Sequence, residues 1–429
     1  MKKKKSYIFI LGTVLTCLLL SATYANDKVY IDIPATGIRK LVVAVPFFST
    51  GNSPVGTKAG KDMADLLGKA LEIYGVIELV NPDRYGGSKE ADWKAMGADY
   101  VIMGKYTADN DKLTVEGQIF DVADSRLLSG KRYKGGLKQR DDMVLRLADA
   151  LIEEFTGSPG ISRTSIAYIS DATRKKEVYV ADVLGRSERQ VTKHRHLCVS
   201  PRYTPDGNLL AYTTYHRGNQ DLYITDLRQA KVTRSLSRRR GMNLAPAFSP
   251  DGKTMVVTLS KNGSPDLYLM NRKGKILQQL TSRAGINVSA SFSPDGKFIV
   301  FVSDRSGKPQ LYVMNMFNRQ VRRLTYKRPE NSEPVWSPRG DLIAFSGLVG
   351  GQYQLFVMDS SGNNEHQLTS SWGDYESPTW SPDGKMLAFT RTRNGRSDIC
   401  IMNKNGKNLR VMLPFKGNKS YPQWSPRPQ

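Results

Sequence analysis

Few residues of this chain have the types and spacing that a catalytic or metal site needs. The chain has four histidines and contains no His-Glu-x-x-His and no Gly-x-Ser-x-Gly pattern, the arrangements that place a metal ligand or a nucleophile beside its base. His194 and His196 could together contact one metal ion, but alternating residues of a strand point to opposite faces. We therefore expect both in a solvated loop, and we predict no enzyme, no metal and no cofactor.

A glycine-bearing loop, Gly51 to Lys58, lies between a predicted strand and a predicted helix, as a phosphate-binding loop does. Such a loop ends in Gly-Lys followed by Ser or Thr, because the lysine must reach the phosphates. Here Thr57 precedes Lys58, so the order is reversed. We interpret the segment as a surface loop.

A four-residue corner of the form Ser/Thr-Pro-Asp/Arg-Gly recurs along the second half of the chain. Proline presets φ, aspartate favours a local turn and glycine closes it, which is the chemistry of a type I turn between antiparallel strands. Arg339 and Arg427 replace the aspartate without spoiling the pattern, so we predict that the corner aspartates are structural. The corners begin at Thr204, Ser249, Ser293, Ser337 and Ser381, with an eroded copy at Ser425, and each follows an aromatic residue.

These corners are 45, 44, 44, 44 and 44 residues apart. Each full corner is followed by three further strand-like runs, and four short strands per period of roughly 44 residues are typical of a β-propeller blade. The stretch from Thr164 to Thr192 has three strands and no corner, whereas the C-terminal "YPQWSPRPQ" is a first strand with nothing after it. Together they make one composite blade, so we predict a six-bladed propeller closed by the C-terminal strand.

The segment before the repeats has a different pattern. "KLVVAVPFF", "VIELV" and "ADYVIMGKYT" indicate strands, and apolar residues at helical spacing indicate helices around Leu67 and Leu147. We therefore predict a multidomain protein. It has a small N-terminal α/β domain at residues 26–157, a linker at 157–162, and an all-β six-bladed β-propeller at 163–429.

The first 25 residues have the pattern of a cleaved secretory signal: four lysines, an apolar run and the exit "SATYA". We expect cleavage after Ala25 and a periplasmic product. Cys17 could instead be a lipoprotein cysteine, but leucines follow it and Thr16 precedes it. No second apolar stretch approaches spanning length, so we expect a protein that works beside membranes without inserting.

The net charge of +23, to which Lys2 to Lys5 contribute four, would suggest a nucleic-acid ligand in another compartment. An exported chain meets no genome, so we expect no nucleic acid, and either a solvated basic surface or steering toward an acidic protein. Of the mature chain's two cysteines, Cys400 stands where other repeats have an aromatic residue, so we expect no disulfide with Cys198.

The combination and order of these features resemble the TolB family, periplasmic components of the Tol-Pal system. The residues that carry the resemblance are "VVAVPFF", "WKAMGADYVIMGKY" and "LADALIEEFTG" in the first domain and "AFSPDGK" and "LYVMN" in the blades. The resemblance covers essentially the whole mature chain; where many relatives have a histidine in the last helix of the first domain, this chain has Leu145. It implies a non-enzymatic, monomeric adaptor that supports outer-membrane integrity and cell division. Its partners would be the lipoprotein Pal, through the propeller, and TolA and other inner-membrane Tol proteins, through the first domain.

The loops that lead from the outer strand of one blade to the inner strand of the next vary while the strands repeat, as expected of a binding face on a rigid scaffold. They are rich in Arg and Lys, which would steer an acidic partner. We predict that the contact ring for Pal, with its steering rim of three arginines, consists of Met242, Asn243, Ala245, Asn287, Asn331, Ser332, Glu333, Tyr375, Arg238, Arg239 and Arg240.

By the same resemblance, the mature N-terminal stretch 26–36, with its alternating "VYIDI", is the predicted contact with TolA. A frayed terminus is the alternative.

Two other classes of propeller protein remain to be considered. Prolyl-oligopeptidase-type enzymes need a hydrolase domain, for which we expect no room after Gln429. A carbohydrate-binding or sensor propeller would show aromatic residues around the channel mouth, and the six positions that begin the inner strands contain only one, Tyr375.

Overall fold

The computed structural model describes residues 39–50, 58–229, 233–282 and 284–428. The predicted signal peptide, the stretch 26–36 and all of the loop Gly51 to Lys58 except its last residue lie outside the described residues. Among the helices that the structure describes, none is long and apolar enough to cross a membrane.

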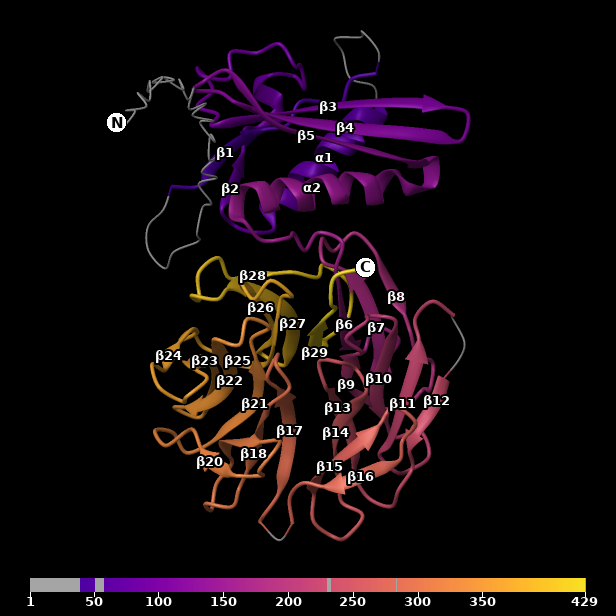
Figure 1. The fold of residues 1–429 in the computed structure, drawn as a ribbon, viewed down its shortest axis with the longest axis vertical. Coiled ribbons are helices and arrows are strands. Elements are labelled where there is room, and N and C mark those ends of the chain that lie inside the picture. The colour runs from indigo at the N-terminus through magenta and orange to yellow at the C-terminus, as the bar shows by residue number, and fades with distance from the viewer. Residues whose placement is uncertain (1–38, 51–57, 230–232, 283, 429) are drawn as a thin grey trace, which may run out of the picture.

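The N-terminal part is one mixed sheet with two helices, as predicted. Parallel pairs join β1 to β2 and β3, whereas β3, β4 and β5 are antiparallel, giving the order β2-β1-β3-β4-β5. Figure 1 shows α2 between this sheet and the propeller. The elements are β1 (Leu41–Ala44), α1 (Lys58–Glu72), β2 (Ile77–Leu79), the 3₁₀ turn η1 (Pro82–Arg84), β3 (Tyr100–Asp109), β4 (Lys112–Asp121), β5 (Arg126–Gly136), the 3₁₀ turn η2 (Leu137–Gln139) and α2 (Arg140–Thr156).

Between α2 and β6 the segment 157–164 has no helix or strand. Gly157 ends α2 in the left-handed conformation, at φ 66°, which glycine adopts without steric cost. The linker was predicted in this segment.

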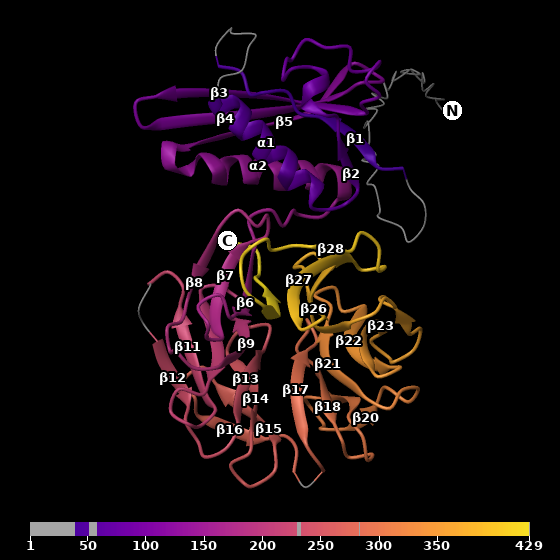
Figure 2. The same cartoon turned by 180° about the vertical axis from the view of Figure 1, so that it is seen from behind.

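Six four-stranded antiparallel sheets form the predicted ring (Figures 1 and 2). The composite first blade has the order β29-β6-β7-β8, so the C-terminal strand does supply its innermost strand. This blade consists of β29 (Lys419–Trp424), β6 (Ser165–Ser170), β7 (Glu177–Asp182) and β8 (Glu188–Gln190).

The other five blades each use four consecutive strands, innermost first. Blades two and three are β9 (Cys198–Tyr203), β10 (Leu209–Thr214), β11 (Asp221–Asp226) and β12 (Thr233–Ser237), then β13 (Asn243–Phe248), β14 (Thr254–Leu259), β15 (Asp266–Asn271) and β16 (Ile276–Gln279). Blade four is β17 (Asn287–Phe292), β18 (Phe298–Ser303), β19 (Gln310–Asn315) and β20 (Val321–Arg323). Blades five and six are β21 (Asn331–Trp336), β22 (Leu342–Val349), β23 (Gln352–Asp359) and β24 (His366–Gln367), then β25 (Asp374–Trp380), β26 (Met386–Arg393), β27 (Arg396–Asn403) and β28 (Arg410–Val411).

The corner aspartates are structural, as predicted. Asp295 accepts hydrogen bonds from the Ser293 hydroxyl at 2.6 Å and from the Lys297 amide at 3.0 Å, which closes the turn between β17 and β18. In blade five, where Arg339 replaces the aspartate, Asp341 accepts the bond from the Ser337 hydroxyl at 2.8 Å. One carboxylate serves the turn in each of the five full corners, and its position can differ by two residues.

The first blade also connects the ring to the N-terminal domain. Arg427, just after β29, donates to the carbonyl oxygens of Pro159 and Gly160 in the linker at 2.8 and 2.9 Å. The hydroxyl of Tyr74, two residues after α1, accepts a hydrogen bond from the Ile161 amide at 2.5 Å. One apolar cluster continues from the α1–α2 pair into blades one and six, so the two parts share a core.

Trp424 is the residue on which this closure most depends. Its side chain is 3% exposed and its indole Nε1 donates to the Thr164 hydroxyl at 2.8 Å. We expect Trp424→Ala to lower the free energy of unfolding by about 3–5 kcal/mol, because it opens a cavity at the seam of the ring. Urea unfolding measures this. Trp372→Ala, on an exposed loop, is the matched control and should cost less than about 0.5 kcal/mol; equal losses for the two variants would contradict the role of Trp424.

Candidate functional site

The inner strands of all six blades are bulged at one repeated position, four residues before the corner Ser or Thr. The strand register shifts there in every blade. Five of the six bulged residues have φ between 51° and 54°, which is uncommon outside glycine. The side chain of the sixth, Ala245, is outside what the structure describes. The five are Ser200, Ser289, Glu333, Ser377 and Tyr421.

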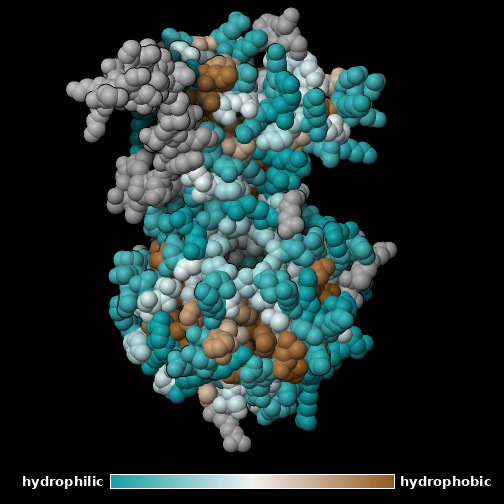
Figure 3. All heavy atoms as spheres, in the orientation of Figure 1, coloured by the Kyte–Doolittle hydropathy of each residue, from teal (hydrophilic) through white to brown (hydrophobic). Residues whose placement is uncertain are grey.

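These bulged residues line the central channel, which is visible as a hollow at the centre of the ring (Figure 3). The channel contains two cavities that share Glu333, Ser377 and Tyr421. We call them the corner chamber, about 400 Å³, which opens among the Ser-Pro corners, and the loop chamber, about 190 Å³, which opens among the blade-connecting loops.

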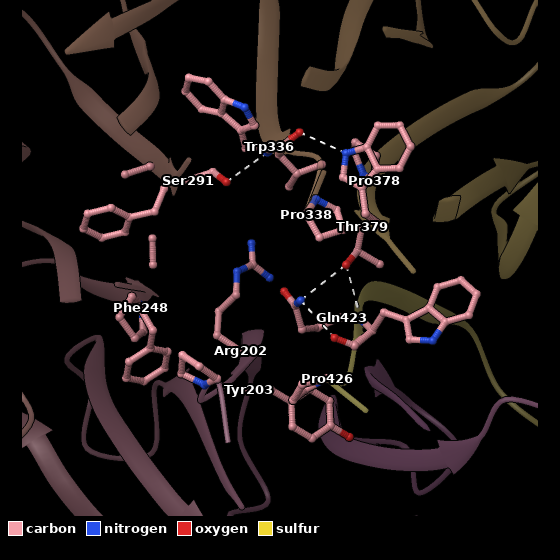
Figure 4. Close-up of a pocket in the computed structure, with 18 of the residues that line it drawn as sticks. Arg202, Tyr203, Phe248, Ser291, Trp336, Pro338, Pro378, Thr379, Gln423 and Pro426 are labelled. Carbon is pink, nitrogen blue, oxygen red and sulfur yellow. Dashed lines mark hydrogen bonds between the residues drawn. The ribbon is translucent and has the colours of Figure 1, made fainter. Parts of the chain in front are cut away.

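The corner chamber has walls that are part apolar and part polar, and it contains one cation. The corner prolines and the aromatic residues before them line it, and Arg202 extends into its middle (Figure 4). The indole N–H groups of Trp336, Trp380 and Trp424 bond to Gly340 O, Val335 O and Thr164 Oγ1. Trp380 and Trp424 are 7% and 3% exposed, so these two rings are packed between the blades and have no free face on which a sugar could stack.

The loop chamber is lined by three carboxylates, Asp171, Glu333 and Glu376, and by one cation, Lys176. Glu333 accepts hydrogen bonds from the Ser377 amide at 2.5 Å and the Ser377 hydroxyl at 2.8 Å. Glu376 lies beside it, and burial, with the charges of Glu333 and Asp374, raises the pKa of Glu376 to about 7. Burial, reinforced by the charges of Glu333 and Glu376, also raises the pKa of Tyr421.

The asparagines of the predicted contact ring are buried at the start of the inner strands. Asn243, Asn287 and Asn331 are all 0% exposed. Asn287 donates to Asp266 of the preceding blade at 3.1 Å and to Gly285 O in its own loop at 2.9 Å. Asn331 likewise donates to Gln310 of the preceding blade at 2.9 Å. We call these contacts the blade clasps; they hold the connecting loops and join neighbouring blades.

The other residues predicted for the site are distributed over three environments. Tyr375 is buried, and its hydroxyl accepts from Arg393. Glu333 lines the channel, while Met242 and Ser332 are partly buried. Among the three arginines, Arg238 and Arg240 are exposed, whereas Arg239 donates to Ser237 Oγ at 2.8 Å and Gly274 O at 3.2 Å. Part of the predicted contact ring thus lies at the surface, and the other residues are buried in the blades. The role of these residues in binding Pal stays a prediction.

Large apolar side chains on the connecting loops were missed by sequence reasoning. We define the loop face as the connecting loops at 191–197, 238–242, 280–286, 324–330, 368–373 and 412–418. Tyr326 is 69% and Trp372 57% exposed on this face, and Leu197 and Ile286 are exposed there too. The sequence does contain a signal for them, because a tryptophan and a tyrosine in polar loops are unusual.

His194 lies in a connecting loop, as predicted, but its ring is packed rather than solvated. Its ring stacks on His216 with centroids 4.9 Å apart, and its Nε2 lies 2.9 Å from the Tyr212 hydroxyl. Burial, followed by the charge of His216, lowers the pKa of His194. His196 is exposed in the same loop, as predicted, and among the described residues no group of three potential metal ligands occurs.

Cys198 and Cys400 are both free and buried, in different blades. Burial raises the pKa of their thiols to about 12 and about 11. Neither has the low pKa that a reactive thiolate requires.

Family models match both parts of the chain. The TolB amino-terminal domain model matches residues 29–128, and the TolB beta propeller domain model matches residues 152–428. The crystal structure of TolB from Acinetobacter baumannii superposes with a TM-score of 0.80 at 26% identity, covering 91% of this chain and 98% of that one.

Curated relatives with the name Tol-Pal system protein TolB match part of the chain. The protein of Desulfotalea psychrophila is 47% identical over 234 residues, 52% of this chain and 53% of the relative. That of Desulfosudis oleivorans is 36% identical over 229 residues, 50% of this chain and 52% of the relative. The chain thus spans about half the length of the curated relatives it matches. These similarities agree with the prediction of a non-enzymatic protein.

The raised pKa of Glu376 makes the stability of the propeller depend on pH. An unfolded glutamate titrates near pH 4.3, so the stabilising effect of a protonated Glu376 is full below that pH and is lost as the pH rises through about 7. We expect Glu376→Gln to be more stable than the wild type by about 1 kcal/mol at pH 8, after allowance for partial solvent screening, and nearly equal at pH 4.

Urea unfolding at the two pH values measures the difference. Glu90→Gln, at an exposed loop position, is the control and should change stability at neither pH. If Glu376→Gln stabilised the protein equally at pH 4 and pH 8, the assignment of this titration would be wrong.

Proposed function

The chain belongs to the TolB family, and from this we propose that it is a periplasmic, non-enzymatic adaptor of the Tol-Pal system. In this role it binds Pal through the propeller and inner-membrane Tol proteins through its N-terminal part, and it supports outer-membrane integrity and cell division. It is exported with cleavage after Ala25 and works as a monomer without a cofactor.

We assign Pal to the loop face. The observation that carries this assignment is the set of exposed apolar side chains there, Leu197, Ile286, Tyr326 and Trp372. Aromatic anchors within a polar surround are typical of the residues that dominate protein–protein affinity. All four belong to connecting loops around one mouth of the channel.

Charge supports the same face. Arg238 and Arg240 are exposed on the loop between β12 and β13, and Lys327 is exposed on the loop between β20 and β21. Positive charge around the rim attracts an acidic partner and raises its association rate. The acidic loop chamber behind the rim then receives a donor or a cationic group of the partner, since Glu376 makes no ion pair with a cation of the described residues.

The blade clasps give the buried asparagines an indirect role in this proposal. Asn243 accepts from the Arg239 amide at 3.2 Å and donates to Gly241 O at 3.0 Å, so it holds the loop that carries Arg238 and Arg240. Asn243, Asn287 and Asn331 thus act as positioning residues behind the contact surface, while Met242, Ser332 and Glu333 remain candidates for direct contact.

Replacing the exposed aromatics tests the assignment of the face. We expect Trp372→Ala and Tyr326→Ala each to weaken binding of the soluble Pal domain by about 2 kcal/mol, near thirtyfold, as for a hot spot. Calorimetry measures the affinity, and unchanged urea unfolding would exclude a folding defect.

The matched control is Phe317→Ala. Phe317 is 96% exposed in the turn after β19, which contacts the corner side through the bond from the Met316 amide to Lys297 O. Its loss should leave Pal affinity unchanged. Loss of binding in the Phe317 variant, with normal binding in the other two, would place Pal on the corner face.

The stretch 26–36 is the proposed contact with TolA. The basis is its alternating "VYIDI", which suits pairing with a strand edge. Deleting residues 26–36 should abolish TolA binding in a pull-down while shifting the melting temperature by no more than about 2 °C, because the segment precedes the first core strand. Undiminished TolA binding by the deletion variant would remove this segment from the adaptor mechanism.

A further inference from the structure

The corner chamber contains a cation that the fold does not explain. The residue before each corner aromatic faces the channel in every blade, and these six residues are Arg202, Ala247, Ser291, Val335, Thr379 and Gln423. Arg202 is the one charged residue of the set. Blade three has an alanine at the same position, so the fold itself does not require an arginine there.

Arg202 has no ionic partner within the part of the chain that the structure describes. Its guanidinium donates to the carbonyl of the preceding residue, Pro201, at 3.0 Å, and no carboxylate of the described residues lies within 4.0 Å of it. Burial lowers the pKa of Arg202, and Glu333 offsets this only partly. Arg202 is partly exposed to the chamber, so its guanidinium keeps some contact with water but lacks a counter-ion, which an anionic ligand would supply.

Two hydroxyl groups near Arg202 are further hydrogen-bond donors in the chamber. The Ser291 hydroxyl oxygen accepts from the Trp336 amide at 3.1 Å, and the Thr379 hydroxyl oxygen accepts from the Trp424 amide at 3.2 Å. Neither O–H donates to an acceptor of the described residues, so each hydroxyl can still donate one hydrogen bond to a ligand. Figure 4 shows Arg202 extending toward the space between Ser291, Thr379 and Gln423.

The walls around these donors are part apolar and part polar, with proline and aromatic side chains alternating with serines and threonines. Pro205, Pro250, Pro294, Pro338, Pro382 and Pro426 line the chamber, together with the aromatic residues before the corners. Its volume of about 400 Å³ falls within the range of small-molecule sites. Glu333 borders the chamber where it meets the loop chamber, and its carboxylate is already hydrogen-bonded to Ser377. An acidic ligand is therefore attracted at Arg202 and repelled at Glu333, which orients it.

We propose that the corner chamber binds a small carboxylate with an apolar body. The carboxylate accepts hydrogen bonds from the Arg202 guanidinium and from the hydroxyls of Ser291 and Thr379. The apolar body lies against the corner prolines. This site is on the opposite side of the channel from the loop face, so its occupancy does not depend on the proposed binding of Pal.

Benzoate and its neutral isostere benzamide are suitable probes for the full mature chain. We expect benzoate to bind in calorimetry with a dissociation constant on the order of 1 mM or tighter, and benzamide to bind at least tenfold more weakly. Inorganic phosphate should also bind at least tenfold more weakly than benzoate. Equal binding of benzamide, equal binding of phosphate, or no binding of benzoate would each overturn the proposal.

Two variants separate a ligand-binding role of these side chains from a structural one. Arg202→Ala reproduces the alanine of blade three, so it should fold with unchanged or higher stability and lose benzoate binding at least tenfold. Ser291→Ala should also fold and should weaken benzoate a few-fold, because one donor is removed. Arg217→Ala, an exposed loop position, is the charge-matched control and should bind benzoate as the wild type does. Wild-type benzoate affinity in both Arg202→Ala and Ser291→Ala would refute the site, as would a marked loss of stability in Arg202→Ala, because Arg202 would then be structural.

Discussion

The pairing of β29 with β6 is the interaction on which the rest of the structure depends. It joins the two ends of the propeller in one blade, from Lys419 opposite Ser170 to Trp424 opposite Ile166. Without it, β6 would present an unpaired inner edge and the ring would stay open. The same strand leads directly to Arg427, which contacts the linker. The same C-terminal segment therefore closes the ring and contacts the linker to the N-terminal domain.

Much of this architecture could be read from the sequence, because it is encoded locally and repeatedly. The corner chemistry recurs every 44 or 45 residues, and the missing first strand at Thr164 matches the surplus strand at the C-terminus. Periodicity also predicted the helices of the first domain, since Met63 and Leu67, like Met143 and Leu147, lie on buried faces. Local sequence patterns, each spanning only a few residues, were therefore sufficient to predict the blades, the closure of the ring and the two helices.

The details of the channel could not be predicted in this way, because they depend on contacts between blades. Asn287 could be assigned to a partner surface as long as its contact with Asp266 in the preceding blade was unknown. The inner-strand bulges follow no residue type, since serine, glutamate and tyrosine all occupy them. They nevertheless decide which side chains enter the channel. The result is a channel with opposite charges in its two halves, Arg202 among the corners and Glu333 and Glu376 toward the loops.

The pairing of β6 with β29 in the first blade also determines the order in which the propeller can fold. Ribosomes and export machineries deliver a chain from its N-terminus, and domains fold as they emerge. Strand β6 comes early and its partner β29 is almost the last segment of the sequence to arrive. During the delivery of more than two hundred intervening residues, β6 can pair only with β7, and its other edge is open to wrong partners. A protein built this way gains a ring without free inner edges once β29 has paired, but β6 needs protection from wrong partners until β29 has been delivered.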